Sequence, residues 1–268
     1  MLRVFTNNNG KTFGRYLTKT ARFFQALVFP HLCLNCRILL NPGTAGPYTG
    51  QACFCKNCLA RGLPLFAPPF CTRCGHMFDT GENHLCETCL KRLPQIGRVR
   101  GALAYQGLVR DILPLFKYQA RLSLTRFFEP LMFDAFSRFF ENKEIHCILP
   151  IPLHARKLRQ RGFNQSFLLV RGFAGTYCKI HGTKPLWEVD TTALKRVRYT
   201  SPQTGFDIAV RRKNLKNAFQ VTDPAAVKER NILLVDDVYT TGATCAEAAR
   251  VLLAAGANRV DVLVLARA

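Results

Sequence analysis

The sequence predicts an α/β protein, a mostly parallel sheet flanked by helices, preceded by a small cysteine-rich domain of the zinc-ribbon type. From about residue 97 onward, short apolar runs alternate with segments of helical periodicity, which is typical of a parallel sheet covered on both faces. Before that point, residues 31–95 contain nine of the 12 cysteines, with many prolines and glycines and little periodicity. This composition favours a small domain held together by metal.

The sequence divides into three regions. Residues 1–30 form a basic arm, in which apolar residues at helical spacing predict an amphipathic helix that ends before Pro30. Such a helix packs on the protein or lies on a membrane surface, and we favour packing. Residues 31–95 form the zinc-binding domain with its four-cysteine sites, and residues 96–268 form the α/β domain.

Within the α/β region, strands and helices are expected in alternation. Strands are predicted at residues 99–105, 145–149, 231–238 and 259–265. Helices are predicted at residues 108–116, 122–140, 165–177 and 245–255. The length of each segment distinguishes predicted strands from predicted helices, because short apolar runs fit strands and longer periodic segments fit helices.

Eight cysteines form four Cys-x-x-Cys pairs. These are Cys33 and Cys36, Cys55 and Cys58, Cys71 and Cys74, and Cys86 and Cys89. Two residues between thiolates let one tight turn present both sulfurs to a tetrahedral ion, so the pairs suffice for one or two structural zinc ions. The gaps favour consecutive pairing, and a cross-braced pairing stays open. Cys53 and His31 are alternative ligands at the first site.

A net charge of +21 and a pI near 9.9 predict an anionic partner, which is nucleic acid, a phosphorylated small molecule or a membrane surface. Residues 153–230 hold 16 Lys and Arg against five acidic residues. No apolar run approaches the roughly 20 residues that span a bilayer, and charged residues interrupt the N-terminal segment where a signal peptide would be apolar. We therefore expect a cytoplasmic protein, with peripheral contact at the inner face of the membrane left open.

Two adjacent carboxylates, Asp236 and Asp237, end the apolar run 232–235. In open α/β sheets, ligands bind beyond the carboxyl ends of the strands. A turn into a helix follows, formed by Thr240, Thr241, Gly242, Ala243 and Thr244. Its N–H groups and hydroxyls suit an anion at the positive end of the helix. The pair and the turn together suit a ligand that carries hydroxyls, phosphate and bound Mg²⁺.

The stretch ILLVDDVYTTGAT (residues 232–244) resembles the phosphoribosyl pyrophosphate (PRPP) motif of type I phosphoribosyltransferases. The resemblance implies the type I phosphoribosyltransferase fold and a PRPP–Mg²⁺ ligand. It also implies that Asp236 and Asp237 bind the ribose 2- and 3-hydroxyls and that residues 240–244 bind the 5-phosphate. In purine-salvage members, the position of Thr240 commonly holds an acidic general base. The neutral threonine here puts purine salvage in doubt and leaves the acceptor open.

Two further blocks narrow the resemblance. The block PIPLHARKLRQRGFNQ (residues 150–165) carries Arg156, Arg159 and Arg161, whose guanidinium groups could bind a diphosphate or a nucleic-acid backbone. A second block carries Thr200, Gln203, Arg211, Asn214, Ala218 and Phe219. With Lys117 and Tyr118, these blocks resemble the ComF family of competence proteins, relatives of the GntX-like proteins, over about residues 29–268.

The ComF resemblance implies a role in natural transformation. The expected protein binds PRPP–Mg²⁺ and handles incoming single-stranded DNA, with a competence helicase or other DNA-uptake proteins as partners. Phe163, Tyr199 and Phe206 lie among basic residues and could stack on bases or pack in the core. The alternative is an active phosphoribosyltransferase that transfers ribose 5-phosphate from PRPP to an acceptor. The sequence identifies neither that acceptor nor a catalytic residue.

Overall fold

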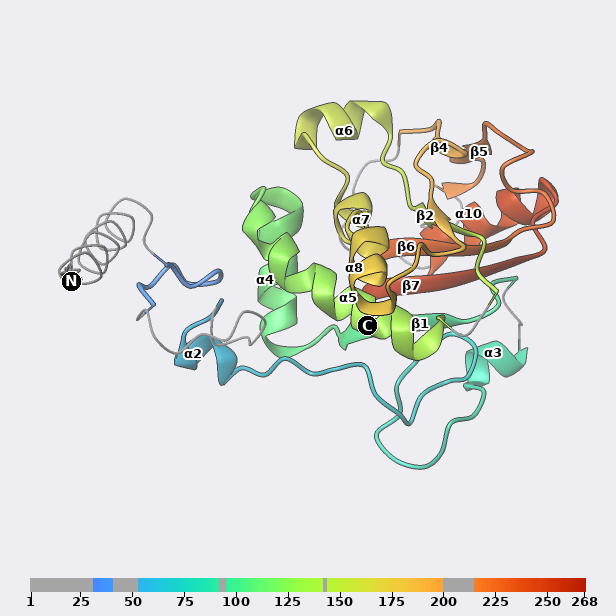
Figure 1. The fold of residues 1–268 in the computed structure, drawn as a ribbon. Coiled ribbons are helices and arrows are strands. Elements are labelled where there is room, and N and C mark those ends of the chain that lie inside the picture. The colour runs from blue at the N-terminus through green and yellow to red at the C-terminus, as the bar shows by residue number, and fades with distance from the viewer. Residues whose placement is uncertain (1–30, 41–52, 92–94, 142–143, 200–214) are drawn as a thin grey trace, which may run out of the picture. The chain divides into compact units, whose positions relative to one another are not determined.

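The computed structural model describes residues 31–40, 53–91, 95–141, 144–199 and 215–268 (Figure 1). The basic arm of residues 1–30 and its predicted helix lie outside the described residues. The chain separates into two compact units, Met1–Ala60 and Arg61–Ala268. The second half of the cysteine-rich region thus belongs to the same compact unit as the sheet, and the domain ranges drawn from the sequence stay predictions.

In the unit Met1–Ala60, the described chain forms two short cysteine-bearing segments. An isolated antiparallel bridge joins Leu32 to Leu39, so residues 31–40 fold back on themselves as a tight loop. The second segment contains helix α2 (Lys56–Leu59).

The unit Arg61–Ala268 is built on a five-stranded sheet with the order β1-β7-β6-β2-β3, in which all neighbouring strands are parallel. The strands are β1 (Val99–Ala104), β2 (Cys147–Pro150), β3 (Glu188–Val189), β6 (Asn231–Tyr239) and β7 (Arg259–Arg267). Strands β6 and β7 are apolar and almost wholly buried, as expected for central strands of a parallel sheet. The prediction of a mostly parallel sheet flanked by helices is confirmed.

Helices cover both faces of this sheet (Figure 1). The helices of this unit are α3 (Glu87–Lys91), α4 (Gly107–Tyr118), α5 (Thr125–Phe139), α6 (Ala155–Arg161), α7 (Gln165–Leu168), α8 (Phe173–His181) and α10 (Ala243–Ala254), with a 3-10 turn η2 (Leu122–Leu124). Helix α10 packs on the face formed by Val260, Val262 and Val264 of β7. Because strand side chains alternate, Leu263 and Leu265 face the opposite side, where α5 contacts β7 and α7 contacts β6.

The core on the α5 side is aromatic. Phe136 lies 5.6 Å from Phe173 of α8 and 5.3 Å from Trp187, measured between ring centroids. Phe116 of α4 lies 5.5 Å from Phe128. Aromatic pairs at these separations add stabilisation beyond the area they bury, so they fix α4, α5 and α8 together.

Two predicted helices differ from the observed ones. The segment 122–140 begins as the 3-10 turn η2 before α5. The segment 165–177 is divided into α7 and α8, and Gly172 stands at the N-cap of α8. The carboxylate of Glu129 on α5 lies against the backbone at Gly172, so a side chain at this break would require the Glu129 carboxylate to move.

A small antiparallel sheet joins β4 (Leu194–Arg196) to β5 (Phe219–Val221). Leu194 and Phe219 are buried. Each strand has only three residues, too few to show an alternating pattern in the sequence.

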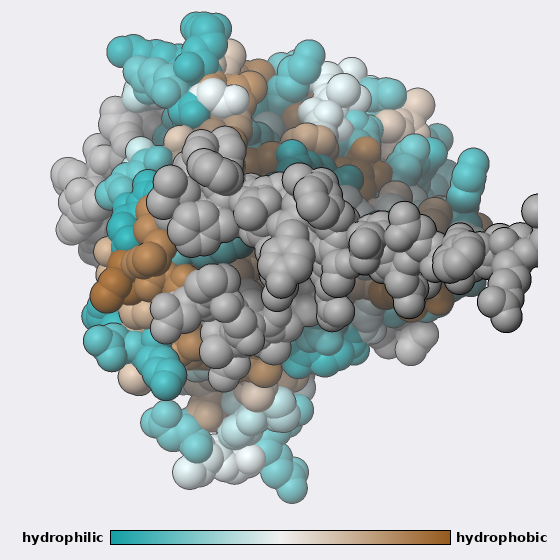
Figure 2. All heavy atoms as spheres, turned by 60° about the vertical axis from the view of Figure 1, so that its left-hand side comes forward, coloured by the Kyte–Doolittle hydropathy of each residue, from teal (hydrophilic) through white to brown (hydrophobic). Residues whose placement is uncertain are grey.

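Hydrophobic patches lie among hydrophilic residues on the face shown in Figure 2. The exposed large hydrophobic residues in the described part of the chain come from several elements, and they include Leu65, Leu90 of α3, Leu122 of η2, Leu158 of α6 and Ile180 of α8. Single exposed apolar residues are ordinary on the surfaces of globular proteins.

Candidate functional site: an acidic pair, a Thr–Gly turn and two cysteine tetrads

The strand order reverses between β2 and β6. From β2 the chain continues to β3 on one side, whereas from β6 it continues to β7 on the other side. Such a switch point leaves a crevice beyond the carboxyl ends of the two strands, where ligands bind in open α/β sheets. Here Pro150 pairs with Val235, so the block at residues 150–165 begins beside Asp236. The topology brings together two of the segments selected from the sequence.

Asp236 and Asp237 are both buried, with 8% and 3% of their surfaces exposed. Lys117 of α4 places Nζ 2.9 Å from Asp237 Oδ1, and the hydroxyl of Ser166 in α7 donates to Asp236 Oδ1 at 3.0 Å. The second oxygen of Asp237, Oδ2, is buried and accepts no hydrogen bond from the described residues. A buried carboxylate oxygen without a donor is costly, and a ligand hydroxyl would satisfy it.

Electrostatics around the acidic pair favour an anion nearby. Burial, and then the charge of Asp237, raise the pKa of Asp236 to about 7, against the opposing effects of Lys117 and Ser166. Burial, followed by the positive charges of Arg161, Arg196 and Lys117, lowers the pKa of Lys157. Four cations from α4, α6 and β4 are therefore close enough to repel one another beside two carboxylates. A phosphate or diphosphate would relieve that repulsion.

The raised pKa of Asp236 predicts how the ligand-free protein responds to pH. The ordinary aspartate pKa is about 3.9. Because the folded-state pKa is raised to about 7, the stability contribution of the protonated side chain is complete below pH 4 and disappears as the pH rises through 7. The melting temperature should fall over this interval. In Asp236→Asn, which cannot titrate, this part of the pH dependence should vanish, and an unchanged profile would contradict the assignment.

The Thr–Gly turn (residues 240–244) connects β6 to α10. Gly242 is the N-cap of α10 and has φ 72°, in the left-handed region that favours glycine. A Cβ atom at Gly242 would overlap the hydroxyl of Tyr239 and lie 2.8 Å from its Cε1 atom. Thr240 is exposed, and Thr241 Oγ1 accepts from the N–H of Ala243 at 3.5 Å. The turn thus presents hydroxyls at the start of a 12-residue helix.

The three arginines predicted to bind phosphate lie on α6. His154 caps this helix, because its Nδ1 accepts from the N–H of Arg156 at 3.2 Å. Arg161 donates to Gln165 Oε1 at 2.6 Å, and its guanidinium lies 5.4 Å from the ring centroid of Tyr118. Arg156 lies 5.0 Å from the ring centroid of Tyr199, and Arg159 is exposed. Helix α6 fully buries none of its seven residues. Arg156 and Arg159 are exposed, whereas Lys157 and Arg161 are half-buried.

The aromatic residues predicted as stacking surfaces for nucleobases have different environments. Phe163 packs 6.0 Å from the buried Phe116, measured between ring centroids. Tyr199 lies under Arg156, whereas Phe206 falls outside the described residues. The family marks Thr200, Gln203, Arg211 and Asn214 also fall outside them, while Ala218 and Phe219 are buried core residues.

The sequence did not predict that Lys157, Ser166 and Arg196 lie near the acidic pair. It singled out Lys117 only as part of the resemblance to the ComF family. These residues are far apart along the chain, and none has a spacing that signals a site. Arg196 on β4 interacts electrostatically with Asp236, 40 residues later in the sequence. Only the folded topology brings these side chains to the acidic pair.

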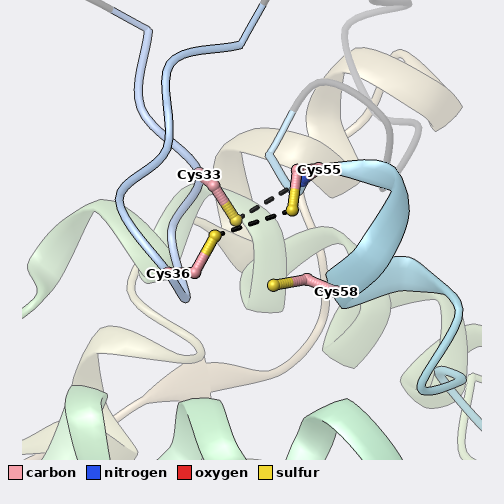
Figure 3. Close-up of side chains that lie close together, drawn as sticks. All are labelled: Cys33, Cys36, Cys55 and Cys58. Carbon is pink, nitrogen blue, oxygen red and sulfur yellow. Dashed lines mark hydrogen bonds between the residues drawn. The ribbon is translucent and has the colours of Figure 1, made fainter.

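The first cysteine tetrad is Cys33, Cys36, Cys55 and Cys58, whose sulfurs lie within 4.8 Å of one another. Figure 3 shows the four side chains directed toward one another. The N–H of Cys55 donates to Cys33 Sγ at 3.4 Å. Burial opposes ionisation, but backbone hydrogen bonds from Cys55, Cys36 and Asn35 outweigh it and lower the pKa of Cys33 to about 7. Cys53 and His31 are not in this group, and the backbone carbonyl of Cys53 accepts from Leu34 instead.

The second tetrad is Cys71, Cys74, Cys86 and Cys89, whose sulfurs also lie within 4.8 Å of one another. The N–H of Cys86 donates to Cys71 Sγ at 3.3 Å. Burial raises the pKa of Cys71, but backbone hydrogen bonds from Cys86, Cys74 and Arg73 outweigh this and lower it to about 6. Both tetrads could therefore hold a metal ion such as zinc, and the predicted consecutive pairing is confirmed.

The second tetrad is joined to the large sheet by backbone and side-chain hydrogen bonds. The N–H of Val99 donates to the carbonyl of Arg73 at 2.8 Å, and that of Phe66 donates to the carbonyl of Ala102 at 3.1 Å. Gly75 has φ 64°, and a Cβ atom there would lie 2.6 Å from the carbonyl oxygen of Val99. The knuckle after Cys74 therefore requires glycine for its conformation and for its close approach to β1.

No protein-family model matches this chain. The chain is 31% identical over 254 residues to the DNA utilization protein YhgH of Escherichia coli O157:H7, covering 90% of this chain and 99% of the relative. It is 29% identical to Competence protein F of Haemophilus influenzae, covering 90% and 98%, and 27% identical to Competence protein ComFC of Bacillus subtilis, covering 75% and 78%.

A solved structure of the allosteric regulatory enzyme of purine biosynthesis is 16% identical over 50% of this chain and 23% of its own, with a TM-score of 0.29. The description of the fold therefore rests on the strand order given above. Among the described residues, every helix is too short or too polar to cross a membrane.

Proposed function

Because this chain belongs to the family of the YhgH DNA utilization proteins and the ComF competence proteins, we propose that it acts in DNA uptake and utilisation, binding PRPP–Mg²⁺ and handling single-stranded DNA. The observation that carries the PRPP part is the buried acidic pair at the switch point. Asp237 keeps one oxygen without a donor among the described residues, and cations surround the pair.

The surroundings of the acidic pair fit the chemistry of PRPP. Lys117 and Ser166 orient the two carboxylates, which would accept hydrogen bonds from the ribose hydroxyls. The N–H groups and hydroxyls of the Thr–Gly turn would hold the 5-phosphate. Lys157, Arg161 and Arg196 would bind the diphosphate. Bound Mg²⁺ would supply further neutralisation of the diphosphate charge.

Asp237→Asn tests the pocket directly. The substitution keeps the shape of the side chain but removes the charge that pairs with Lys117, and it places an amide where a hydroxyl should donate. We expect PRPP–Mg²⁺ affinity to fall at least tenfold, equivalent to about 1.4 kcal/mol, when measured by isothermal titration calorimetry. Asp134→Asn, an exposed position paired with Arg138 on α5, is the matched control and should bind normally. Full affinity in Asp237→Asn with an unchanged melting temperature would place the pocket elsewhere.

Helix α6 supports the single-strand part of the proposal. It exposes Arg156 and Arg159, while Tyr118 and Tyr199 lie under Arg161 and Arg156. Alternation of guanidinium groups and aromatic rings suits a flexible strand, because phosphates pair with the cations and bases can stack on the rings. Tyr118 is 67% exposed, which leaves ring surface open to a base.

Binding of a single-stranded oligonucleotide should weaken steeply with salt. Each phosphate neutralised contributes a slope of about −0.7 in a plot of log affinity against log salt concentration. Arg159→Ala should therefore make the slope shallower by about 0.7, as measured by fluorescence anisotropy. Arg250→Ala removes the same charge from α10, where Arg250 pairs with Glu247, and should leave the slope unchanged. Salt-independent affinity in the wild type would exclude this mode of binding.

Phosphoribosyl transfer is the second candidate function. The cations Lys157, Arg161 and Arg196 favour it, because they could stabilise the charge that develops on a departing pyrophosphate. Thr240 is exposed at the turn and offers a hydroxyl rather than a carboxylate base. Pyrophosphate release from PRPP with a panel of nucleobase and amine acceptors distinguishes transfer from binding alone. Because thiolate metal sites need a reducing compartment, we place either activity in the cytoplasm, with uptake proteins such as the competence helicase as partners.

A further inference from the structure

Arg267 links the second tetrad to the end of strand β6. It lies on β7 between β1 and β6, paired in register with Ala104 and Tyr239. Its Nε donates to the carbonyl of Cys74 at 3.0 Å, and its Nη1 donates to the carbonyl of Tyr239 at 3.2 Å. Arg267 is only 6% exposed, so these hydrogen bonds form in a site that largely excludes water. A single guanidinium group thus holds two backbone segments together.

Tyr239 contacts both Arg267 and the Thr–Gly turn. Its ring centroid lies 5.0 Å from the guanidinium carbon of Arg267, within the range of a cation–π contact. The opposite end of the ring fills the space that a side chain at Gly242 would need. The ring therefore packs closely against the backbone of Gly242, the N-cap of α10, and a movement of the ring toward the turn would displace this residue.

The charge of a metal-loaded tetrad explains why its occupancy matters to Arg267. Four thiolates around one Zn²⁺ carry a net charge of −2. Arg267 Nη2 lies 4.0 Å from Cys74 Sγ, so the guanidinium faces this charge directly. Loss of the metal would lower that charge and release the knuckle whose carbonyl accepts from Arg267.

We propose that Arg267 is a positioning residue that couples metal occupancy of the second tetrad to the geometry of the Thr–Gly turn. The inference rests on the proposed PRPP site for its consequence, which is that metal loading sets PRPP affinity. Coupling between two sites is reciprocal, so PRPP–Mg²⁺ must stabilise the metal by the same factor. The second tetrad then serves the ligand site as well as the fold.

The test compares the full-length, zinc-loaded wild type with Arg267→Met, which keeps side-chain length but loses the guanidinium. In the wild type, saturating PRPP–Mg²⁺ should protect one zinc ion by raising its affinity roughly tenfold, measured at equilibrium in competition with a chromogenic chelator, within the range of ordinary coupling energies. In Arg267→Met this protection should disappear, and PRPP affinity should fall by a similar factor. Arg250→Met on α10 is the matched control for the loss of one charge and should behave as the wild type.

Hydrogen exchange provides a readout that needs no ligand. With zinc content equal to that of the wild type, Arg267→Met should accelerate amide exchange several-fold in residues 239–246 and leave the rest of β6 protected. A purely structural role would instead accelerate exchange throughout β6 and β7. Arg267→Lys keeps the charge but cannot bridge both carbonyls, so it should show the same local effect, and it replaces Arg267→Met should that variant fail to fold.

The two proposals fail in different ways. If the wild type binds no PRPP, the proposed function is overturned. The rate of amide hydrogen exchange in residues 239–246 then tests by itself whether Arg267 positions the Thr–Gly turn. If the wild type binds PRPP but exchange in these residues is the same in Arg267→Met, the coupling is overturned while the pocket stands. The coupling would also be overturned if PRPP–Mg²⁺ still protected the zinc of Arg267→Met from the chelator.

Discussion

Cys74→Ser is expected to unfold the unit Arg61–Ala268, whereas Cys36→Ser is expected to leave the melting of that unit unchanged. Both cysteines are the second member of the first pair in their tetrads. The physical difference lies in their surroundings, because the second tetrad is hydrogen-bonded to β1 and β7 and the first belongs to the unit Met1–Ala60. Structural zinc supplies about 10–16 kcal/mol of apparent binding free energy, which matches or exceeds the total stability of an ordinary domain.

Thermal unfolding followed by near-ultraviolet circular dichroism, with zinc content from elemental analysis, measures this contrast. Cys36→Ser should lose up to one equivalent of zinc and keep the cooperative transition of the sheet. Cys74→Ser should lose the other equivalent together with the transition. Equal losses of stability in both variants would show that the second tetrad has no special role in the large unit, and a folded, zinc-free Cys74→Ser protein would show that metal is dispensable for the sheet.

Gly242→Ala is expected to reduce PRPP affinity about a hundredfold and to destabilise the protein by about 1–3 kcal/mol from backbone strain alone. The methyl group would overlap the Tyr239 hydroxyl and stand 2.8 Å from Cε1, so the turn cannot keep its geometry unless the ring moves. Tyr239→Phe should not rescue the variant, because Cζ of the ring is also in the way. Calorimetric titration with PRPP–Mg²⁺ and thermal unfolding measure the two effects.

Gly182→Ala is the matched control for the backbone. Gly182 has φ 70°, almost the same as Gly242, but no atom lies within 4 Å of the position that its Cβ would take. This variant should show the strain of a left-handed alanine without a loss of affinity. Similar PRPP affinities for Gly182→Ala and Gly242→Ala would mean that the Thr–Gly turn does not hold the phosphate.

Much of this architecture was predictable, because local patterns determine it. The apolar runs around Ile148 and Leu233 are short and unbroken, as buried parallel strands require. The Cys-x-x-Cys spacing predicted both tetrads and their consecutive pairing, which is confirmed. The ComF resemblance is confirmed by the curated relatives.

Tertiary contacts determined what the sequence did not reveal. The predicted helix 165–177 divides at Gly172, where the carboxylate of Glu129 from another helix lies against the backbone. Ser166 and Lys117 reach the acidic pair from α7 and α4, and no spacing in the sequence relates them to it. Arg267 connects Cys74 to Tyr239, and it is hydrogen-bonded to Cys74 across a sequence separation of 193 residues. No local motif predicts a contact over this separation.

Helix α6 has a consequence for the time a ligand stays bound. It buries none of its seven side chains, so hydrophobic burial does not hold it. The described side-chain bonds that fix it are the His154 cap, the bond from Asn164 to the carbonyl of Ile151 at 3.1 Å and the bond from Arg161 to Gln165 Oε1 at 2.6 Å. Segments with so little buried apolar surface open at low free-energy cost, on a faster timescale than the packed core. In the proposed pocket, the half that carries Lys157 and Arg161 would therefore separate from the acidic pair while the sheet remains intact. The residence time of PRPP would then depend on the opening of this helix, and single-stranded DNA bound along α6 would slow the release of PRPP.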